Sequence, residues 1–329
     1  MIETFAYARA GLLGNPSDGY YGKTISFILK NFRARVLLYP SARLEIKSGA
    51  ADIPIWESLD ELRAQTRWRG YYGGIRILKA LIMRFTDYCD EKGIELHDRN
   101  FTLEYESNIP LRLGMGGSSA IIIAALRALS QYFGVELSKP EQANLALETE
   151  TRYLGVGAGL QDRVIQVYEG LVFMDFAREL MQKQGHGQYE ALNPSLLPHV
   201  YVAYRRSLSE GTEVFHNNIR SRFEEGDPLV VNAMQRWAAI AAEGRQALLE
   251  HDHAAFDKLI DENFDLRASI YKLGEGNLEM VRTARGVGAT AKFAGSGGAI
   301  VGTVRDPEHF AKLSEAMAKI DVAVMTPKM

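Results

Sequence analysis

The sequence contains a single cysteine, Cys89, among 329 residues. One thiol excludes an internal disulfide framework and a cysteine-rich zinc site, and it is typical of proteins in a reducing compartment, so we expect a cytoplasmic location. There is also no excess of charge of one sign, because 38 lysine and arginine residues face 41 aspartate and glutamate residues, giving a net charge of −3. Therefore no global field attracts a nucleic acid or an anionic membrane surface.

Long hydrophobic runs are missing as well. The best apolar stretch, residues 120–129, is interrupted by Arg127, and residues 1–10 carry Glu3 without an apolar segment. A membrane-spanning helix needs about 20 predominantly apolar residues in succession. We therefore expect neither a signal peptide nor a membrane span. The composition, 47% hydrophobic and 24% charged, is that of an ordinary folded protein.

Chain length and apolar periodicity predict two domains that mix strands and helices. Domains usually contain roughly 100–200 residues, and glycine and proline cluster between residues 185 and 198, so we expect domains at 1–190 and 191–329. Strands are predicted at 25–39, 44–46, 101–105, 171–175, 200–204, 299–304 and 322–325. Helices are predicted at 75–93, 120–129, 140–154, within 228–285 and at 307–319.

Three glycine-bearing segments carry the chemistry, and the first spans residues 9–24. Its end is a near miss of the phosphate-binding P-loop, because Ser17 stands at the first glycine position. A P-loop also needs a helix after its lysine, whereas the residues after Lys23 predict a strand. A tight turn between two strands explains the glycines of this segment, but it does not explain the embedded Arg9 and Asp18.

The second segment, residues 110–120, is a glycine-rich loop that opens a buried helix. Its unencumbered backbone N–H groups and the positive end of the helix dipole form an anion site, for which a triphosphate is the obvious occupant. A dinucleotide fingerprint is disfavoured because Ser119 replaces the third glycine. A serine N-cap after a flexible loop is an equally good explanation from this segment alone.

The third segment, residues 291–299, is a glycine-rich turn ahead of a strand, where the backbone comes close to a ligand or to the first domain.

Two acids lie between the second and third segments. Glu150 is expected near the C-terminal end of its helix, and Asp162 at the start of another. A carboxylate at a helix N-terminus is stabilised in its ionised form. We therefore expect Asp162 to accept a hydrogen bond or a proton.

The order of these motifs along the chain resembles the GHMP kinase superfamily, named for galactokinase, homoserine kinase, mevalonate kinase and phosphomevalonate kinase. Shorter strings at 11–18, 23–26, 70–74, 158–164, 196–198 and 295–299 resemble the glucuronokinase branch. The resemblance implies an α+β, two-domain fold, with an N-terminal domain like domain 2 of ribosomal protein S5 and a ferredoxin-like C-terminal domain. It also implies ATP-dependent phosphorylation of the anomeric hydroxyl of D-glucuronate, with Mg²⁺ as the metal.

The same resemblance implies roles for individual residues. Asp162 and Arg9 take the catalytic positions, and Ser119 and Glu150 bind the metal. Because the loop has one glycine more than the usual pattern, Ser118 is the alternative to Ser119. ATP is bound by Gly114, Met115, Gly116, Gly117, Ser118, Ser119 and Ala120. The sugar is bound by Asn15, Ser17, Asp18, Tyr72, Gly295, Ser296 and Gly297.

A uronic acid requires, in addition, a cation or donor for its carboxylate, and arginine provides bidentate geometry. Arg163, Arg112 and Lys23 are all eligible, with Tyr71 and Tyr72 as neighbours of the sugar.

Three other functions stay open: a related kinase of a neutral sugar or heptose, a kinase of a non-sugar alcohol, and a catalytically silent nucleotide- and sugar-binding regulator. The expected partner is a small molecule, neither nucleic acid nor membrane, and a homodimer is left open.

Overall fold

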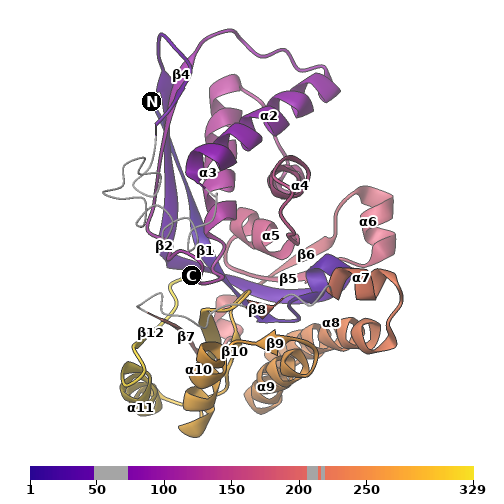
Figure 1. The fold of residues 1–329 in the computed structure, drawn as a ribbon, viewed down its shortest axis with the longest axis vertical. Helices are drawn as coiled ribbons and strands as arrows, with labels where there is room; N and C mark the ends of the chain where they lie inside the picture. Colours follow the sequence, from indigo (N-terminus) through magenta and orange to yellow (C-terminus); the bar gives the residue numbers. More distant parts are fainter. Residues whose placement is uncertain (48–72, 206–213, 216–218) are drawn as a thin grey trace, which may run out of the picture. The chain divides into compact units, whose positions relative to one another are not determined.

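A computed structural model describes residues 1–47, 73–205, 214–215 and 219–329 (Figure 1). The chain divides into two compact units. Unit 1 comprises Met1–Tyr7, Phe32–Ile109 and Gly117–Ala158, and unit 2 comprises Ala8–Asn31, Pro110–Gly116 and Gly159–Met329. The long strands β1 (Ile2–Leu13) and β2 (Lys23–Pro40) contribute residues to both units. The predicted domain boundary at residue 190 stays a prediction.

Unit 1 combines strands with packed helices. Its further strands are β3 (Glu45–Ile46) and β4 (Phe101–Ser107). Its helices are α2 (Gly74–Lys92), α3 (Gly117–Phe133) and α4 (Lys139–Glu148), followed by the π-helical turn η2 (Thr149–Tyr153). Strand β4 pairs antiparallel with residues 34–40 of β2 and parallel with β3. Helix α3 packs against α2, α4 and β4, and its apolar side chains are almost all buried.

The helix boundaries in unit 1 follow from local chemistry. Gly93 ends α2 in a left-handed conformation (φ 67°), as the glycine there predicts. Ser138 and Glu141 form the predicted capping box at the start of α4. The predicted helix 140–154 is present as α4, which ends at Glu148, and continues as the π-helical turn η2. The hydroxyls of Thr149 and Thr151 donate to carbonyl oxygens four residues earlier, and such bonds compete with regular helix geometry.

Unit 2 contains three sets of paired strands. Strand β5 (Leu171–Asp175) pairs antiparallel with residues 23–27 of β2 and with β6 (Gln188–Leu192). A four-stranded antiparallel sheet has the order β10 (Lys292–Phe293), β11 (Ala299–Val304), β7 (His199–Arg205) and β12 (Val322–Met325). Strand β8 (Val214–Phe215) pairs with β9 (Lys272–Leu273).

Since β2 begins at Lys23, the segment before it is a turn between strands and not a P-loop.

Unit 2 also contains helices, several of which pack against its four-stranded sheet. They are α5 (Gln161–Tyr168), α6 (Arg178–Gln184), α7 (Ile219–Glu224), α8 (Pro228–Leu249), α9 (His253–Ile270), α10 (Glu275–Gly286) and α11 (Pro307–Ala318), with the 3-10 turns η1 (Ser17–Tyr20) and η3 (Pro194–Leu196). Helices α8 and α9 lie side by side (Figure 1). Helices α9, α10 and α11 bury Phe264, Met280 and Leu313 against sheet residues such as Tyr201 and Phe293.

Gly302, in the middle of β11, is expected to be the most sensitive glycine of this sheet. A Cβ at this position would overlap the backbone carbonyl oxygen of Thr290, which cannot move as a flexible side chain would. The Gly302→Ala variant should therefore lower the free energy of unfolding by about 2 kcal/mol or more, measured by urea denaturation. Gly286→Ala is the matched control, because a Cβ there meets open space. Equal stability of the two variants would contradict this packing.

Candidate active site

The centre of the candidate site is an ion pair between Arg9 on β1 and Asp162 in the first turn of α5. Arg9 Nε and Nη2 each donate to one carboxylate oxygen of Asp162, both at 2.6 Å. The arginine side chain is 6% exposed and that of Asp162 is 20% exposed. A bidentate, largely buried pair of this kind holds both side chains in one geometry. The structure thus brings together the two residues that the sequence predicts as catalytic.

The third nitrogen of the guanidinium ties this pair to two glycine segments. Arg9 Nη1 donates to the carbonyl oxygen of Gly114 and, at 3.2 Å, to that of Ala294. The glycines allow the approach, since a Cβ on Gly295 would overlap the Gly114 carbonyl, and one on Gly114 would lie 2.7 Å from the Ser296 nitrogen. Residues from the second and third glycine segments therefore meet at Arg9.

Asp18, in the turn η1, lies next to the ion pair. Its Oδ2 accepts a hydrogen bond from the backbone nitrogen of Gln161 at 3.1 Å, and only a glycine at position 159 leaves room for this carboxylate. The pKa of Asp18 is raised to about 6, mainly by burial and in addition by the negative charge of Asp162, whereas the hydrogen bond from Gln161 and the charges of Arg163 and Arg9 oppose the rise. Two neighbouring carboxylates, with Arg9 and Arg163 close to them, are suited to orient hydroxyl groups.

The other predicted sugar-binding residues of the first segment have structural partners. Asn15 is buried, and its side-chain oxygen accepts a hydrogen bond from Lys292 Nζ at 2.5 Å. Lys292 also donates to the carbonyl oxygens of Gly11 and Phe293, both at 2.8 Å. The Ser17 hydroxyl is fully buried and bonds both backbone groups of Lys23. These contacts hold the turn in which Asp18 is presented.

The remaining predicted substrate residues are placed as follows. Gly295, Ser296 and Gly297 form the turn that meets Arg9, and the Ser296 side chain is exposed. Tyr72 and its neighbour Tyr71 lie outside the described residues. Among the three candidates for the substrate carboxylate, Lys23 is ion-paired with Asp175, and Arg163 Nη1 donates to the carbonyl oxygen of Gly159 at 2.8 Å. Arg112 is an exposed residue with φ 60°.

The glycine-serine loop leads directly into α3. Gly114 and Gly116 adopt left-handed backbone conformations, with φ of 61° and 75°, and the helix begins at Gly117. In unit 1, Ser118 Oγ donates to Glu150 Oε1 at 2.7 Å, and Glu150 is 2% exposed. Ser119 is fully buried. A serine hydroxyl and a carboxylate in contact form a set of hard oxygen donors that fits Mg²⁺, which is commonly held by one or two carboxylates together with substrate phosphates.

Sequence reasoning overlooked two polar residues of α9, Asn263 and Arg267. Asn263 is 1% exposed, and it accepts from the backbone nitrogen of Gly14 at 2.7 Å and donates to the carbonyl oxygen of Asn15 at 3.3 Å. Arg267, four residues later, is 4% exposed. The signal was present, since both positions continue the spacing of three and four residues of the buried face that includes Phe256 and Ile260. Polar residues on such a face indicate a specific partner.

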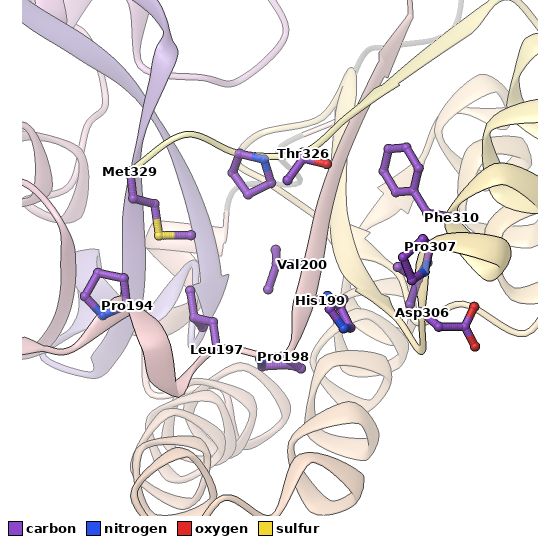
Figure 2. Close-up of a pocket in the computed structure, with 12 residues that line it drawn as sticks. Pro194, Leu197, Pro198, His199, Val200, Asp306, Pro307, Phe310, Thr326 and Met329 are labelled. Carbon is purple, nitrogen blue, oxygen red and sulfur yellow. The ribbon is translucent and has the colours of Figure 1, made fainter.

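A separate pocket of about 310 Å³ lies at the edge of the four-stranded sheet (Figure 2). Its walls come from the segment before β7, the start of α11 and the C-terminal residues. Among the lining residues are Leu197, Val200, Phe310 and Met329, which make it mainly apolar. Arg9, Asp18 and Asp162 are not among the residues that line it, so this pocket is distinct from the candidate site.

In residues 1–47, 73–205 and 219–329, no three or more histidine, cysteine or acidic side chains cluster so that they could hold a metal ion by themselves. The described helices likewise include none with the length and hydropathy needed to cross a lipid bilayer.

Comparisons with known proteins show the family to which this chain belongs. Residues 77–170 match the GHMP kinases N terminal domain. The chain is 46% identical over 308 residues to probable glucuronokinase 2 of Arabidopsis thaliana, which covers 92% of this chain and 84% of the relative. Glucuronokinase 1 of the same organism is 45% identical over 306 residues, with coverage of 91% and 84%. The chain belongs to the GHMP kinase family. Within that family it is similar to the glucuronokinases over most of its length.

A solved structure of another protein has the same fold. The crystal structure of Lactococcus lactis galactokinase complexed with galactose superimposes with a TM-score of 0.77, covering 99% of this chain and 93% of that chain at 15% identity. At such low identity the likeness shows the fold alone. The predicted α+β, two-domain GHMP kinase fold is thereby confirmed.

Asp18 should make the stability of the protein depend on pH. Its folded-state pKa of about 6 lies above the ordinary value of 3.8, so the folded state loses stability relative to the unfolded state as pH rises through this window. The Asp18→Asn variant should therefore be more stable than the wild type at pH 8, by on the order of 2 kcal/mol, and equally stable below pH 4. Thermal unfolding across pH 4–8 measures this.

The exposed Asp98 provides the control for this measurement. Asp98→Asn should change stability little at any pH in this window. A difference between Asp18→Asn and the wild type that is constant from pH 4 to pH 8 would contradict the burial of Asp18.

Proposed function

We propose that this protein is an ATP-dependent sugar kinase that phosphorylates the anomeric hydroxyl of D-glucuronate to give glucuronate 1-phosphate. The observation that carries the proposal is the bidentate Arg9–Asp162 pair beside Asp18. The identity of 45–46% with the Arabidopsis glucuronokinases supports the choice of substrate. The reaction is a phosphoryl transfer to an alcohol, so positioning and charge stabilisation account for most of the catalysis.

Asp162 acts as the residue that orients the anomeric hydroxyl and accepts its proton. Arg9 holds the carboxylate in one orientation, because two of its nitrogens are bonded to Asp162 and the third to backbone carbonyl oxygens. Asp18, whose side chain lies next to the Arg9–Asp162 pair, accepts hydrogen bonds from other hydroxyls of the sugar. The glycine turn 295–297 and Asn15 complete the surroundings of the sugar, and Tyr72 is proposed from the sequence alone.

Residues 114–120 bind the triphosphate of ATP. Gly114 and Gly116 have no side chain to keep a ligand away from the backbone, and the start of α3 at Gly117 adds the positive end of a helix dipole. Glu150 and the Ser118 hydroxyl that donates to it would hold Mg²⁺, with Ser119 as the alternative serine. When bound, the ion neutralises the negative charge of the phosphate oxygens.

Location and assembly are proposed from the sequence. The single cysteine supports a cytoplasmic location. The proposed partner is a small sugar acid, and a homodimer remains an open alternative to a monomer.

The direct test of the function measures Mg²⁺-dependent ATP consumption with D-glucuronate, D-galacturonate, D-glucose, D-galactose, a heptose and mevalonate, followed by phosphorus NMR of the product. An anomeric phosphate signal that depends on glucuronate is expected. Turnover of a neutral sugar alone would contradict the uronate assignment while keeping the kinase mechanism. ATP binding without turnover of any substrate would favour a regulator or an untested alcohol.

Asp162→Asn should lower kcat by roughly 10²- to 10⁴-fold, because the amide cannot accept the proton of the attacking hydroxyl. Binding of ATP and of the sugar, measured by calorimetry, should persist. Asp175→Asn is a matched control, since it also breaks an ion pair of a strand residue, the one with Lys23. A kcat near that of the wild type in Asp162→Asn would show that the base is another group.

A further inference from the structure

Arg267 on α9 is a buried guanidinium with few partners. Its Nη1 donates to the carbonyl oxygen of Gly295 at 3.0 Å, whereas its Nε is buried without a hydrogen-bond acceptor among the described residues. The guanidinium carbon lies 5.1 Å from the ring centre of Phe293 and 5.2 Å from that of Tyr271. These rings fix the plane of the guanidinium in place.

No carboxylate of residues 1–47, 73–205 or 219–329 is paired with Arg267. Two nearby arginines show the usual arrangement: Arg9 is paired with Asp162, and Arg285 with Asp261 and Asp265. Burial lowers the pKa of Arg267, and the pKa of the neighbouring Lys292 is lowered by burial and by the charges of Arg267 and Arg9. A buried, uncompensated cation is costly unless an anion joins it.

The position of Arg267 links it to the sugar site. The pKa of Tyr271 is raised to about 12 mainly by burial, with Arg267 opposing and with Tyr20 and Asp18 adding to the rise. Asp18 in turn lies within electrostatic reach of Asp162 and Arg9. Arg267 and the Arg9–Asp162 pair are further connected through adjacent carbonyl groups, those of Gly295 and Ala294. Arg267 is thus linked to the residues that we propose to bind the sugar.

We propose that Arg267 binds the carboxylate of the sugar acid and thereby determines the preference for a uronic acid over a neutral sugar. The proposal rests on the proposed function. Arg267 keeps its bond to Gly295, and its remaining N–H groups donate to the two carboxylate oxygens. The three candidates that the sequence offers are placed otherwise. Lys23 is paired with Asp175, and Arg163 Nη1 lies 3.7 Å from Asp162 Oδ2 and donates to the carbonyl oxygen of Gly159. Arg112 is exposed.

The test compares D-glucuronate with D-glucuronamide, which has the same ring and a neutral amide in place of the carboxylate. In the wild type, kcat/KM should be higher for glucuronate. In Arg267→Met, kcat/KM for glucuronate should fall by roughly 10- to 100-fold, whereas that for glucuronamide and the KM for ATP should change little. Calorimetric titration with glucuronate in the absence of ATP should show the same loss of affinity.

A second variant and a control keep the result interpretable. Arg267→Lys retains the charge without the planar fork, so its loss should be intermediate. Arg285→Met removes an arginine that also stacks on an aromatic ring, Phe264 at 5.2 Å, but that has carboxylate partners. It should lower the melting temperature and leave the preference for glucuronate unchanged. Arg267→Met should instead melt at or above the wild-type temperature, because an uncompensated buried charge is removed.

Four outcomes would overturn the assignment. A preference for glucuronate that survives in Arg267→Met contradicts it directly. An equal loss for glucuronate and glucuronamide, with a raised KM for ATP, would place the arginine on the transferred phosphoryl group. Loss of the preference in Arg220→Gln instead would assign the carboxylate to an exposed arginine, which lies 5.5 Å from the Tyr20 ring. If the wild type does not phosphorylate glucuronate, the proposed function fails together with this inference.

Discussion

The bidentate contact between Arg9 and Asp162 is the constraint on which the candidate site depends. One guanidinium bonds to both oxygens of a carboxylate on α5 and to carbonyl oxygens of two glycine segments. Segments that are more than 100 residues apart in the sequence are therefore held by one side chain. The glycines at 114 and 295 follow from this contact, because a side chain at either position would push the backbones apart.

Burial of charge around this contact gives the site its chemical character. Asp18 titrates near pH 6 because burial and the charge of Asp162 both oppose its ionisation. On the cationic side, Lys292 satisfies its three donors with backbone and amide oxygens, and Arg267 has one carbonyl partner. The site thus has acceptors for hydroxyl groups and, in Arg267, a buried guanidinium that no carboxylate of the described residues pairs with. Such an arrangement suits a ligand that carries hydroxyls and a negative charge, which is the chemistry of a sugar acid.

Much of this architecture could be predicted from the sequence, because periodicity and turn residues act locally. The apolar spacing gives α2, the capping box gives the start of α4, and the position of Asp162 in the first turn of α5 follows from the glycines before it. The end of α4 could not be predicted, since threonine hydroxyls there bond back to the helix backbone. The environment of Arg267 depends on residues from α9, β10 and the glycine turn, and no local pattern shows which of them meet.

The central claim is that Asp162, held by Arg9, receives the proton of the anomeric hydroxyl. A crystal structure with D-glucuronate and a non-hydrolysable ATP analogue tests it most directly. The account predicts the C1 hydroxyl oxygen at a hydrogen-bond distance of about 2.6–3.2 Å from a carboxylate oxygen of Asp162, with the contact to Arg9 intact. A sugar bound with C1 away from Asp162, or an ion pair that opens when the sugar binds, would contradict the account.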